Sequence, residues 1–337
     1  MMARFNLHLY GLAVFAAVTM VYVFLSRPIS FTPRVADLTY GRLREIRDDR
    51  FPRYAIATFL SEASSPDDSS DEDYYFTAAR ILAYQVLHDP ATKSNRTTIP
   101  FLVLVTDEVS DAKREQLQRD GAQVIHGGDI PLTRWTSTGA THWNNQFNKL
   151  RLLGMTQYDR ILFLDADTIL TRPIDGIFNE PQSQAAATSL LVERPKQIRW
   201  EEGQPPAEYV FAARSDNGLT GQRDHPFPPK ETDEFSAGFW LAAPSVELYQ
   251  YFLNVMSQYP RFDPKTMDQA LLNYAFRRDG TMPWQELNYT WSASWPSMSD
   301  VEGGVASLHD RFWTSAPDSL KERWWGLKKK MEAFVTR

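Results

Sequence analysis

Apolar segments of two kinds alternate along the first half of the chain, and they predict strands and helices in turn. Short uninterrupted apolar runs are typical of strands buried on both faces. Longer segments with apolar residues three or four positions apart are typical of helices. Strand and helix alternating in this way produce a mainly parallel sheet, because each helix carries the chain back to start the next strand in the same direction. We predict strands at 54–60, 101–105, 122–125 and 161–164, and helices at 75–88, 111–119 and 143–155.

The pattern becomes irregular from Pro181 to Lys230 and is regular again after it. An insertion of this size with little periodicity is more often functional than structural. Beyond it we predict a strand at 234–243 and helices at 245–257, 266–277 and 320–334. The predicted fold class is therefore α/β, a mainly parallel sheet flanked by helices. The insertion also carries aromatic residues that are candidates for stacking on sugars, namely Trp200, Tyr209, Phe211 and Phe227.

The N-terminus contains an apolar segment, residues 7–25, with no Asp, Glu, Lys or Arg. As a helix it would extend about 28 Å, close to the hydrocarbon thickness of a thin bilayer. We expect an uncleaved signal anchor of type II topology, and a cleaved signal peptide is the alternative. The domains expected from this are a short cytoplasmic tail (1–6), the transmembrane anchor (7–25), a stem (26–50) and a lumenal catalytic domain (51–337). The sequons at Asn95 and Asn288 are compatible with a lumenal address in the ER or Golgi membrane.

Composition narrows the classes of protein that this chain can be. A net charge of −6 provides no basic excess to neutralise phosphates, so we expect no nucleic-acid partner. The absence of cysteine excludes disulfides and Cys-based zinc sites. Neither a G-x-G-x-x-G nor a G-x-x-x-x-G-K-[ST] motif follows a predicted strand, which disfavours Rossmann dinucleotide sites and P-loop nucleotidases.

The strand at 161–164 ends on two acids, Asp165 and Asp167, separated by one alanine. Open α/β sheets bind ligands at the carboxyl ends of their strands, where this pair lies. Two carboxylates this close cannot both be buried without a compensating charge. A divalent cation with oxygen ligands supplies that charge and would also hold phosphate groups.

Six ordered motifs around this pair carry a resemblance to a known family. They are Y-A-I-A-T-F-L at 54–60, F-L-V-L-V-T at 101–106, N-K-L-R-L-L-G-M-T-Q-Y-D-R-I-L-F-L-D-A-D-T-I-L at 148–170, F-S-A-G-F-W at 235–240, D-Q-A-L-L-N at 268–273 and L-H-D-R-F-W at 308–313. The chain resembles the glycogenin-like, family 8 glycosyltransferases over residues 51–315, and especially their fungal Golgi N-acetylglucosaminyltransferase-like branch. The 148–170 stretch is the most specific of the six.

The resemblance implies a GT-A type nucleotide-diphospho-sugar transferase fold and sugar transfer with retention at the anomeric carbon. It implies that Asp165, Asp167 and His309 hold Mn²⁺ (or Mg²⁺) against the diphosphate of the donor, and two carboxylates plus one imidazole suit such a cation. Lys149 would ease the charge on the leaving group. Asp268 and Gln269 match the D-Q pair that lies beside the anomeric carbon, where an oxocarbenium-like transition state gains from a nearby oxygen.

Further donor contacts follow from the same resemblance. Thr58 and Leu60, with Tyr74 or Tyr75, match the position that cradles uridine. The segment Ser236-Ala237-Gly238 replaces the N-S-G or N-A-G of relatives, so a hydroxyl stands where an amide contacts the donor sugar. After His309 the family's G-x-K-P-W pattern is also missing, and Arg311 is a candidate for binding the diphosphate.

The function expected from the sequence is Mn²⁺-dependent transfer of a hexose or N-acetylhexosamine from a UDP-sugar, most plausibly UDP-GlcNAc or UDP-glucose. The expected acceptor is a glycan, glycoprotein or glycolipid. A metal-dependent sugar nucleotidyltransferase is one alternative, although the Gly-rich loop typical of that class does not follow the first strand. A catalytically silent, lectin-like or scaffold relative is another, and Ser236 is the residue that favours it.

Overall fold

The computed structural model describes residues 53–62, 72–137, 144–189 and 199–336. The segments predicted as tail, anchor and stem lie outside these ranges, as does Trp143 at the start of the helix predicted at 143–155. Residues Phe51–Arg337 form one compact unit. Within the described ranges, the helices are all too short or too polar to cross a membrane.

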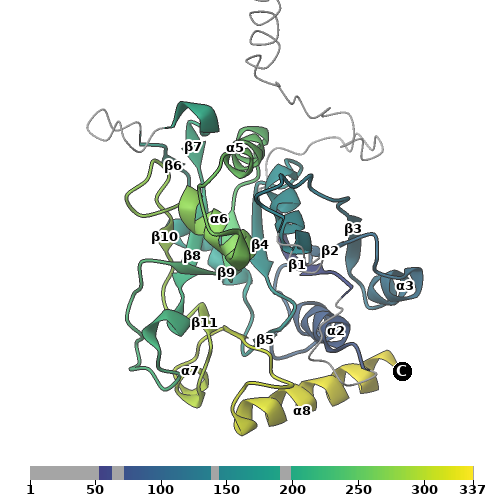
Figure 1. Cartoon of the computed structure of the whole chain (residues 1–337). Coiled ribbons are helices and arrows are strands. Elements are labelled where there is room, and N and C mark those ends of the chain that lie inside the picture. Colours follow the sequence, from purple (N-terminus) through teal and green to yellow (C-terminus); the bar gives the residue numbers. More distant parts are fainter. Residues whose placement is uncertain (1–52, 63–71, 138–143, 190–198, 337) are drawn as a thin grey trace, which may run out of the picture. The chain divides into compact units, whose positions relative to one another are not determined.

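A seven-stranded sheet forms the centre of the described chain, with the strand order β10-β8-β9-β4-β1-β2-β3 (Figure 1). Strands β1 to β4 are mutually parallel, β9 runs antiparallel to both β4 and β8, and β10 is parallel to β8. The prediction of a mainly parallel sheet is confirmed. The strands are β1 (Tyr54–Leu60), β2 (Phe101–Val105), β3 (Gln123–His126), β4 (Arg160–Leu164), β8 (Phe211–Ser215), β9 (Phe235–Ala242) and β10 (Gln285–Glu286).

A small three-stranded sheet lies at the carboxyl end of β4. Its order is β11-β12-β5, with β11 parallel and β5 antiparallel to β12. These strands are β5 (Thr168–Leu170), β11 (Ser292–Ser294) and β12 (Ser307–His309). None of these strands was predicted from the sequence, because three residues are too few for a visible period. A further antiparallel pair joins β6 (Ala186–Ala187) to β7 (Glu208–Tyr209).

Most of the described α-helices begin at a side chain that caps their first turn, as free backbone N–H groups require. The Asp73 carboxylate accepts from the Phe76 N–H, and the Ser245 hydroxyl accepts from the Leu248 N–H. The α-helices are α2 (Tyr74–Leu87), α3 (Asp111–Arg119), α5 (Val246–Ser257), α6 (Met267–Ala275), α7 (Met298–Glu302) and α8 (Asp318–Val335). The 3₁₀ helices are η2 (Asn145–Gly154), η3 (Asp175–Asn179), η4 (Pro181–Ser183), η5 (Trp200–Glu202), η6 (Asn217–Thr220) and η7 (Pro264–Thr266).

The two faces of the sheet bury separate hydrophobic cores. Ala55, Ala57 and Phe59 of β1 pack with residues of η2, α5 and α6, whereas Ile56 and Leu60 pack with residues of α2. This alternation follows from the two-residue period of a strand. A third core lies under α8, which runs alongside α2 (Figure 1).

The helix predicted at 143–155 is confirmed over Asn145–Gly154, where it is a 3₁₀ helix. Phe147, Leu150 and Leu153 are all buried, and their spacing of three matches the three residues per turn of a 3₁₀ helix rather than the 3.6 of an α-helix.

A central strand was also missed inside the segment predicted to be irregular. Strand β8 pairs with β9 and β10, and all five of its residues are buried. Its sequence looks unlike a buried strand because it contains Arg214, whose guanidinium forms an ion pair with Glu286 of β10. A paired charge can be buried, so a charged residue alone does not exclude a central strand.

Candidate active site

Asp165 and Asp167 leave the carboxyl end of β4 and are half-buried. The Asp165 N–H donates to the Gly238 carbonyl of β9 (2.9 Å), and the Asp165 carbonyl accepts from the Thr168 N–H (3.1 Å), which starts β5. The tight turn between β4 and β5 thus fixes both acids.

His309 reaches these acids from the end of β12. Its pairing with Thr168 in the β12–β5 ladder sets the position of the ring. The Nε2 atom lies 3.1 Å from Asp167 Oδ1 and 3.7 Å from Asp165 Oδ2. One ligand atom from each of the three residues lies within 4.8 Å of the others. We call Asp165, Asp167 and His309 the acidic triad; its two carboxylate oxygens and one imidazole nitrogen suit a hard or borderline divalent cation.

Gly238 makes room for the triad. A Cβ atom at this position would lie 2.4 Å from His309 Cε1 and 3.0 Å from Asp165 Oδ2. Only a residue without a side chain allows β9 to pass this close to both groups. The cradle around the triad therefore depends on a glycine in a central strand.

The charges of the triad respond to one another. Burial lowers the pKa of His309, but the carboxylates of Asp167 and Asp165 outweigh burial and raise this pKa to about 9. Burial would raise the pKa of Asp167, yet the adjacent imidazolium outweighs it, and the pKa of Asp167 is lowered. The positive charge of the His309 imidazolium offsets the negative charges of Asp165 and Asp167. The triad therefore favours a positive charge beside its two carboxylates.

Lys149 and Asp268 form a buried ion-pair network beneath Asp165. The Lys149 Nζ lies 2.8 Å from Asp165 Oδ1 and 3.3 Å from Asp268 Oδ2, and both side chains are 5% exposed. Burial lowers the pKa of Lys149, but the two carboxylates outweigh burial and the pKa is raised. Burial raises the pKa of Asp268 to about 6, against the opposing effect of Lys149. Lys149 therefore contacts the triad directly at Asp165, and Asp268 contacts it only through Lys149. The direct contacts of both residues with a donor stay predictions.

Gln269 is more accessible than its neighbour Asp268, and both the oxygen and the nitrogen of its side-chain amide form hydrogen bonds. Its Oε1 accepts from the Ala237 N–H (3.3 Å), and its Nε2 donates to Asp216 Oδ2 (3.3 Å). Met267, just before this pair, has a φ of 52°, which is uncommon for a residue with a side chain. Such strained backbone persists where the surroundings impose it, and it is frequent at functional sites.

The other predicted site residues lie around the triad with different exposure. Thr58, Leu60, Ser236 and Ala237 are buried, and the Ser236 hydroxyl accepts from the Gly238 N–H (3.3 Å). A donor could contact Thr58 and Leu60 only through their backbone groups or after their side chains move.

Two further predicted residues are less buried. Tyr75 contacts Trp313 edge to face at 5.0 Å, and Arg311 is exposed. Lys149 and Gly238 therefore contact Asp165 of the triad, Asp268 contacts Lys149, and Gln269 contacts Ala237 beside Gly238. Thr58 and Leu60 are buried in β1.

Two polar residues that the sequence analysis missed belong to this site. Asp216 follows β8 as Asp165 follows β4, and these strands run in the same direction. Its Oδ1 accepts from the Ser294 hydroxyl at 2.7 Å, so it joins α6 to β11. An acid at the carboxyl end of a parallel strand is the signal that identified Asp165. It was not applied to Asp216 because β8 itself went unrecognised.

The aromatic residues predicted to stack on sugars divide into two groups. Tyr209 and Phe211 are 4% and 0% exposed, in the core, and Phe211 stacks on Phe276, so the prediction is wrong for both. Trp200 is 87% exposed and Phe227 is 37% exposed. These two remain available for a ligand.

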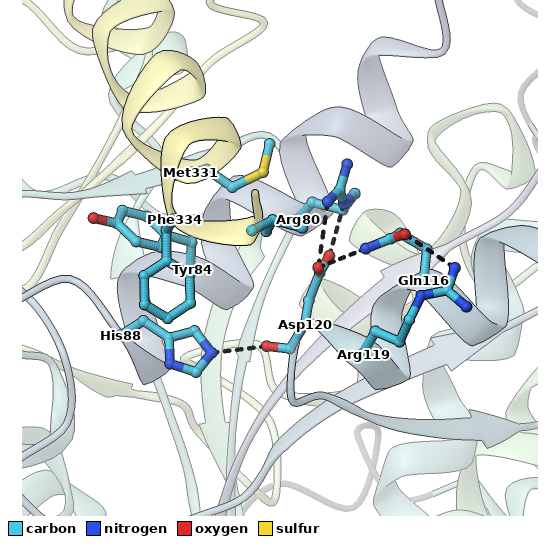
Figure 2. Close-up of a pocket in the computed structure, with 9 residues that line it drawn as sticks. Arg80, Tyr84, His88, Gln116, Arg119, Asp120, Met331 and Phe334 are labelled. Atoms are coloured by element: carbon cyan, nitrogen blue, oxygen red, sulfur yellow. Dashed lines mark hydrogen bonds and ion pairs between the residues drawn. The ribbon is translucent and has the colours of Figure 1, made fainter. Parts of the chain in front are cut away.

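A cavity of about 370 Å³ lies apart from the triad, between α2, α3 and the end of α8 (Figure 2). Its polar groups already bind one another. The Arg80 guanidinium and the Gln116 amide both donate to the Asp120 carboxylate, and His88 bonds to the Asp120 carbonyl. No convergent set of free polar groups is presented among the described residues that line it. We therefore place the functional site at the triad.

Comparisons with known proteins find glycosyltransferases among the proteins similar to this chain. The chain is 30% identical over 305 residues to the uncharacterized protein C4C3.09 of Schizosaccharomyces pombe, covering 82% of this chain and 77% of that protein. It is 28% identical over 192 residues to human glycogenin-1, covering 55% of this chain and 41% of glycogenin. The solved glycosyltransferase GlyE of Streptococcus pneumoniae matches 84% of this chain and 63% of its own at 15% identity and a TM-score of 0.49. No protein-family model matches the chain.

Proposed function

The chain belongs to the same family as the S. pombe protein C4C3.09 and is a glycosyltransferase with glycogenin among its homologues, and from this premise we propose that it transfers sugar from a nucleoside diphosphate donor with a divalent cation at the acidic triad. One observation carries the proposal. His309, far along the chain from the two acids, lies with its Nε2 within 3.7 Å of both carboxylates. A lone D-x-D pair is common in solvated loops, whereas this third ligand completes a cation site.

The residues around the triad have separable roles in this function. Lys149 offsets the charge of Asp165 and Asp268, and Gly238 leaves space for the His309 ring. Asp216 and the Ala237 N–H hold the Gln269 amide in one orientation at the edge of the site. A cation bound at the triad would offset the negative charge that develops on a departing diphosphate.

The finer proposal is a GT-A type, retaining enzyme that uses Mn²⁺ (or Mg²⁺) and a UDP-sugar. UDP-GlcNAc or UDP-glucose is the donor we propose, as in the fungal Golgi branch that the motifs resemble. The acceptor would be a glycan, glycoprotein or glycolipid. The identity of the donor sugar is less well constrained than the nucleotide, because the Ser236 hydroxyl accepts from the Gly238 N–H instead of pointing into the site.

The first test is metal-dependent donor cleavage. We expect the purified protein to release UDP from UDP-GlcNAc or UDP-glucose in the presence of Mn²⁺, and to slow by at least about tenfold when EDTA replaces the metal. Chromatography of the nucleotides measures the release. GDP-mannose, assayed in parallel, controls for the choice of base.

Two other outcomes would replace this function. Formation of pyrophosphate from UTP and a sugar 1-phosphate would identify a nucleotidyltransferase. Binding of UDP-sugars without any UDP release, with Mn²⁺ present, would identify a silent relative.

We propose further that residues 7–25 anchor the protein in the ER or Golgi membrane with the catalytic domain in the lumen. Lumenal exposure predicts N-glycosylation at Asn288, which is exposed. The Asn288 Oδ1 accepts from both the Thr290 N–H (3.0 Å) and the Thr290 hydroxyl (2.7 Å), and this turn leaves its amide nitrogen available. Full-length protein made in a eukaryotic host is expected to migrate faster on gels after peptide N-glycosidase F, and N288Q is expected to lose that change.

Asn95 provides the matched sequon. Its backbone N–H and its amide both donate to the Asp175 carboxylate, at 3.1 and 3.4 Å, so its side chain is less free to carry a glycan. N95Q should therefore keep the glycosidase-sensitive band. A full-length chain with no glycosidase-sensitive species would argue against the lumenal orientation.

A further inference from the structure

Arg223 ties together three segments next to the triad. It comes from the 181–230 segment and lies after η6. Its Nη1 donates to Asp310 Oδ2 (2.6 Å) and to the Pro296 carbonyl (3.1 Å), and its Nη2 donates to the Ser315 carbonyl (3.3 Å). The guanidinium also lies over the Trp295 ring, 5.0 Å from the ring centroid. A planar fork with several donors can hold such a set of acceptors, which a lysine cannot.

Two of the residues that Arg223 contacts are themselves bonded to triad residues. The Trp295 N–H donates to the His309 carbonyl (3.1 Å), and the Asp310 N–H donates to the Asp167 carbonyl (3.2 Å). Each of these bonds fixes the backbone of a triad residue. A single residue thus separates Arg223 from each of two triad residues, Asp310 from Asp167 and Trp295 from His309.

The local backbone makes this support necessary. Trp295 has a φ of 51°, a left-handed conformation that a bulky residue adopts only when its surroundings impose it. The Asp310 side chain is 7% exposed, and without Arg223 its remaining side-chain partner would be the Ser315 hydroxyl at 2.8 Å. Loss of the guanidinium would leave a buried carboxylate poorly compensated and a strained turn unsupported.

We propose that Arg223 is a positioning residue for the cation site, acting through Asp310 and Trp295 on the spacing of Asp167 and His309. The inference rests on the proposed metal-dependent function. Arg223 does not touch the triad, so its substitution alters how the ligands are held and leaves all three present. Residues that orient metal ligands typically change metal affinity by about 10- to 100-fold when they are replaced.

The chain offers a matched control in Arg172. Its Nε donates to the Gly304 carbonyl (3.2 Å), its Nη2 donates to the Thr290 carbonyl (3.0 Å), and its guanidinium lies 4.6 Å from the Trp291 ring centroid. It clamps the segments that enter β11 and β12, whereas Arg223 clamps those that leave them. R172M therefore removes an equivalent arginine from the same pair of strands at the end away from His309.

The experiment titrates Mn²⁺ into the full chain with UDP present and reads free Mn²⁺ by electron paramagnetic resonance. R223M is expected to weaken Mn²⁺ binding by about 10- to 100-fold and R172M by less than about twofold, although both lower the melting temperature. R223K keeps the charge but offers a single nitrogen in place of the fork, so an intermediate affinity is expected, and it serves as the test if R223M does not fold. Unchanged Mn²⁺ affinity in the Arg223 variants, or an equal loss in R172M, would overturn the role. Wild-type chain that binds no Mn²⁺ would instead refute the proposed function, and this role with it.

Discussion

Replacing Asp167 with Asn is expected to abolish metal-dependent donor binding and to slow sugar transfer by about 1000-fold, the scale seen when a key electrostatic group is removed from an active site. The amide keeps the size of the side chain but carries no charge. It also loses the pairing with the His309 imidazole, 3.1 Å away, that lowers the pKa of Asp167. The rate of UDP release and the Mn²⁺ titration described above measure the two effects.

The D167N variant is informative only if the protein still folds, and its melting temperature checks this. Asp167 is half-buried, and the hydrogen bond that its carbonyl accepts from the Asp310 N–H does not depend on the carboxylate. The melting temperature in the absence of metal should therefore fall by no more than a few degrees, as expected for loss of about 1 kcal/mol in a chain of this size.

Asp175 provides the control for the change of charge. Its carboxylate accepts from the Asn95 backbone N–H and lies in η3, outside the triad. D175N removes one negative charge and should leave Mn²⁺ affinity and turnover near wild type. Near-normal UDP-sugar turnover in D167N, with unchanged Mn²⁺ affinity, would mean that the triad is not the cation site.

The sheet could largely be predicted from sequence, and the exceptions have local physical causes. β1, β2 and β4 were predicted because fully buried strands are uninterrupted apolar runs. β8 was not, because the buried Arg214 interrupts its run and its partner Glu286 lies on a strand of only two residues. Pairing across the sheet, which the sequence does not display, decides whether a charge can be buried.

The residues of the candidate site also differ in whether a local sequence pattern identifies them. Asp165 and Asp167 were identifiable from the residues alone, since an acid pair directly after a buried strand is a local pattern. His309 required the resemblance to a family, because nothing around it distinguishes it from an ordinary histidine. Arg223 and Ser294 carry no local signal, since their roles come from contacts with segments distant in sequence. The proposed role of each residue stays a prediction until variants are measured.

Replacing Gly238 with Ala is expected to weaken Mn²⁺ binding by about 100-fold while leaving every ligand of the triad in the chain. The new Cβ would lie 2.4 Å from His309 Cε1 and 2.6 Å from Nδ1, whereas ordinary contacts begin near 3.4 Å. The ring must therefore move by about 1 Å, well beyond the tolerance of about 0.2 Å in a metal–ligand distance. Gly238 is not among the residues with a positive φ, so the backbone itself accepts alanine. The Mn²⁺ titration measures the loss, and the melting temperature reports the accompanying strain.

A double-mutant cycle with His309→Ala isolates the cause. Beside the intact ring, G238A should destabilise the protein by about 1–3 kcal/mol, as overpacking does. In the H309A background the methyl group enters the space left by the imidazole, and the effect of G238A should fall to that of the remaining 3.0 Å contact with Asp165 Oδ2. G326A gives the baseline, because a Cβ at Gly326 in α8 meets nothing within 4 Å and should stabilise the helix by about 0.5–1 kcal/mol. Equal destabilisation by G238A with and without His309 would show that the glycine serves some other contact, and the steric account of the cation site would then be wrong.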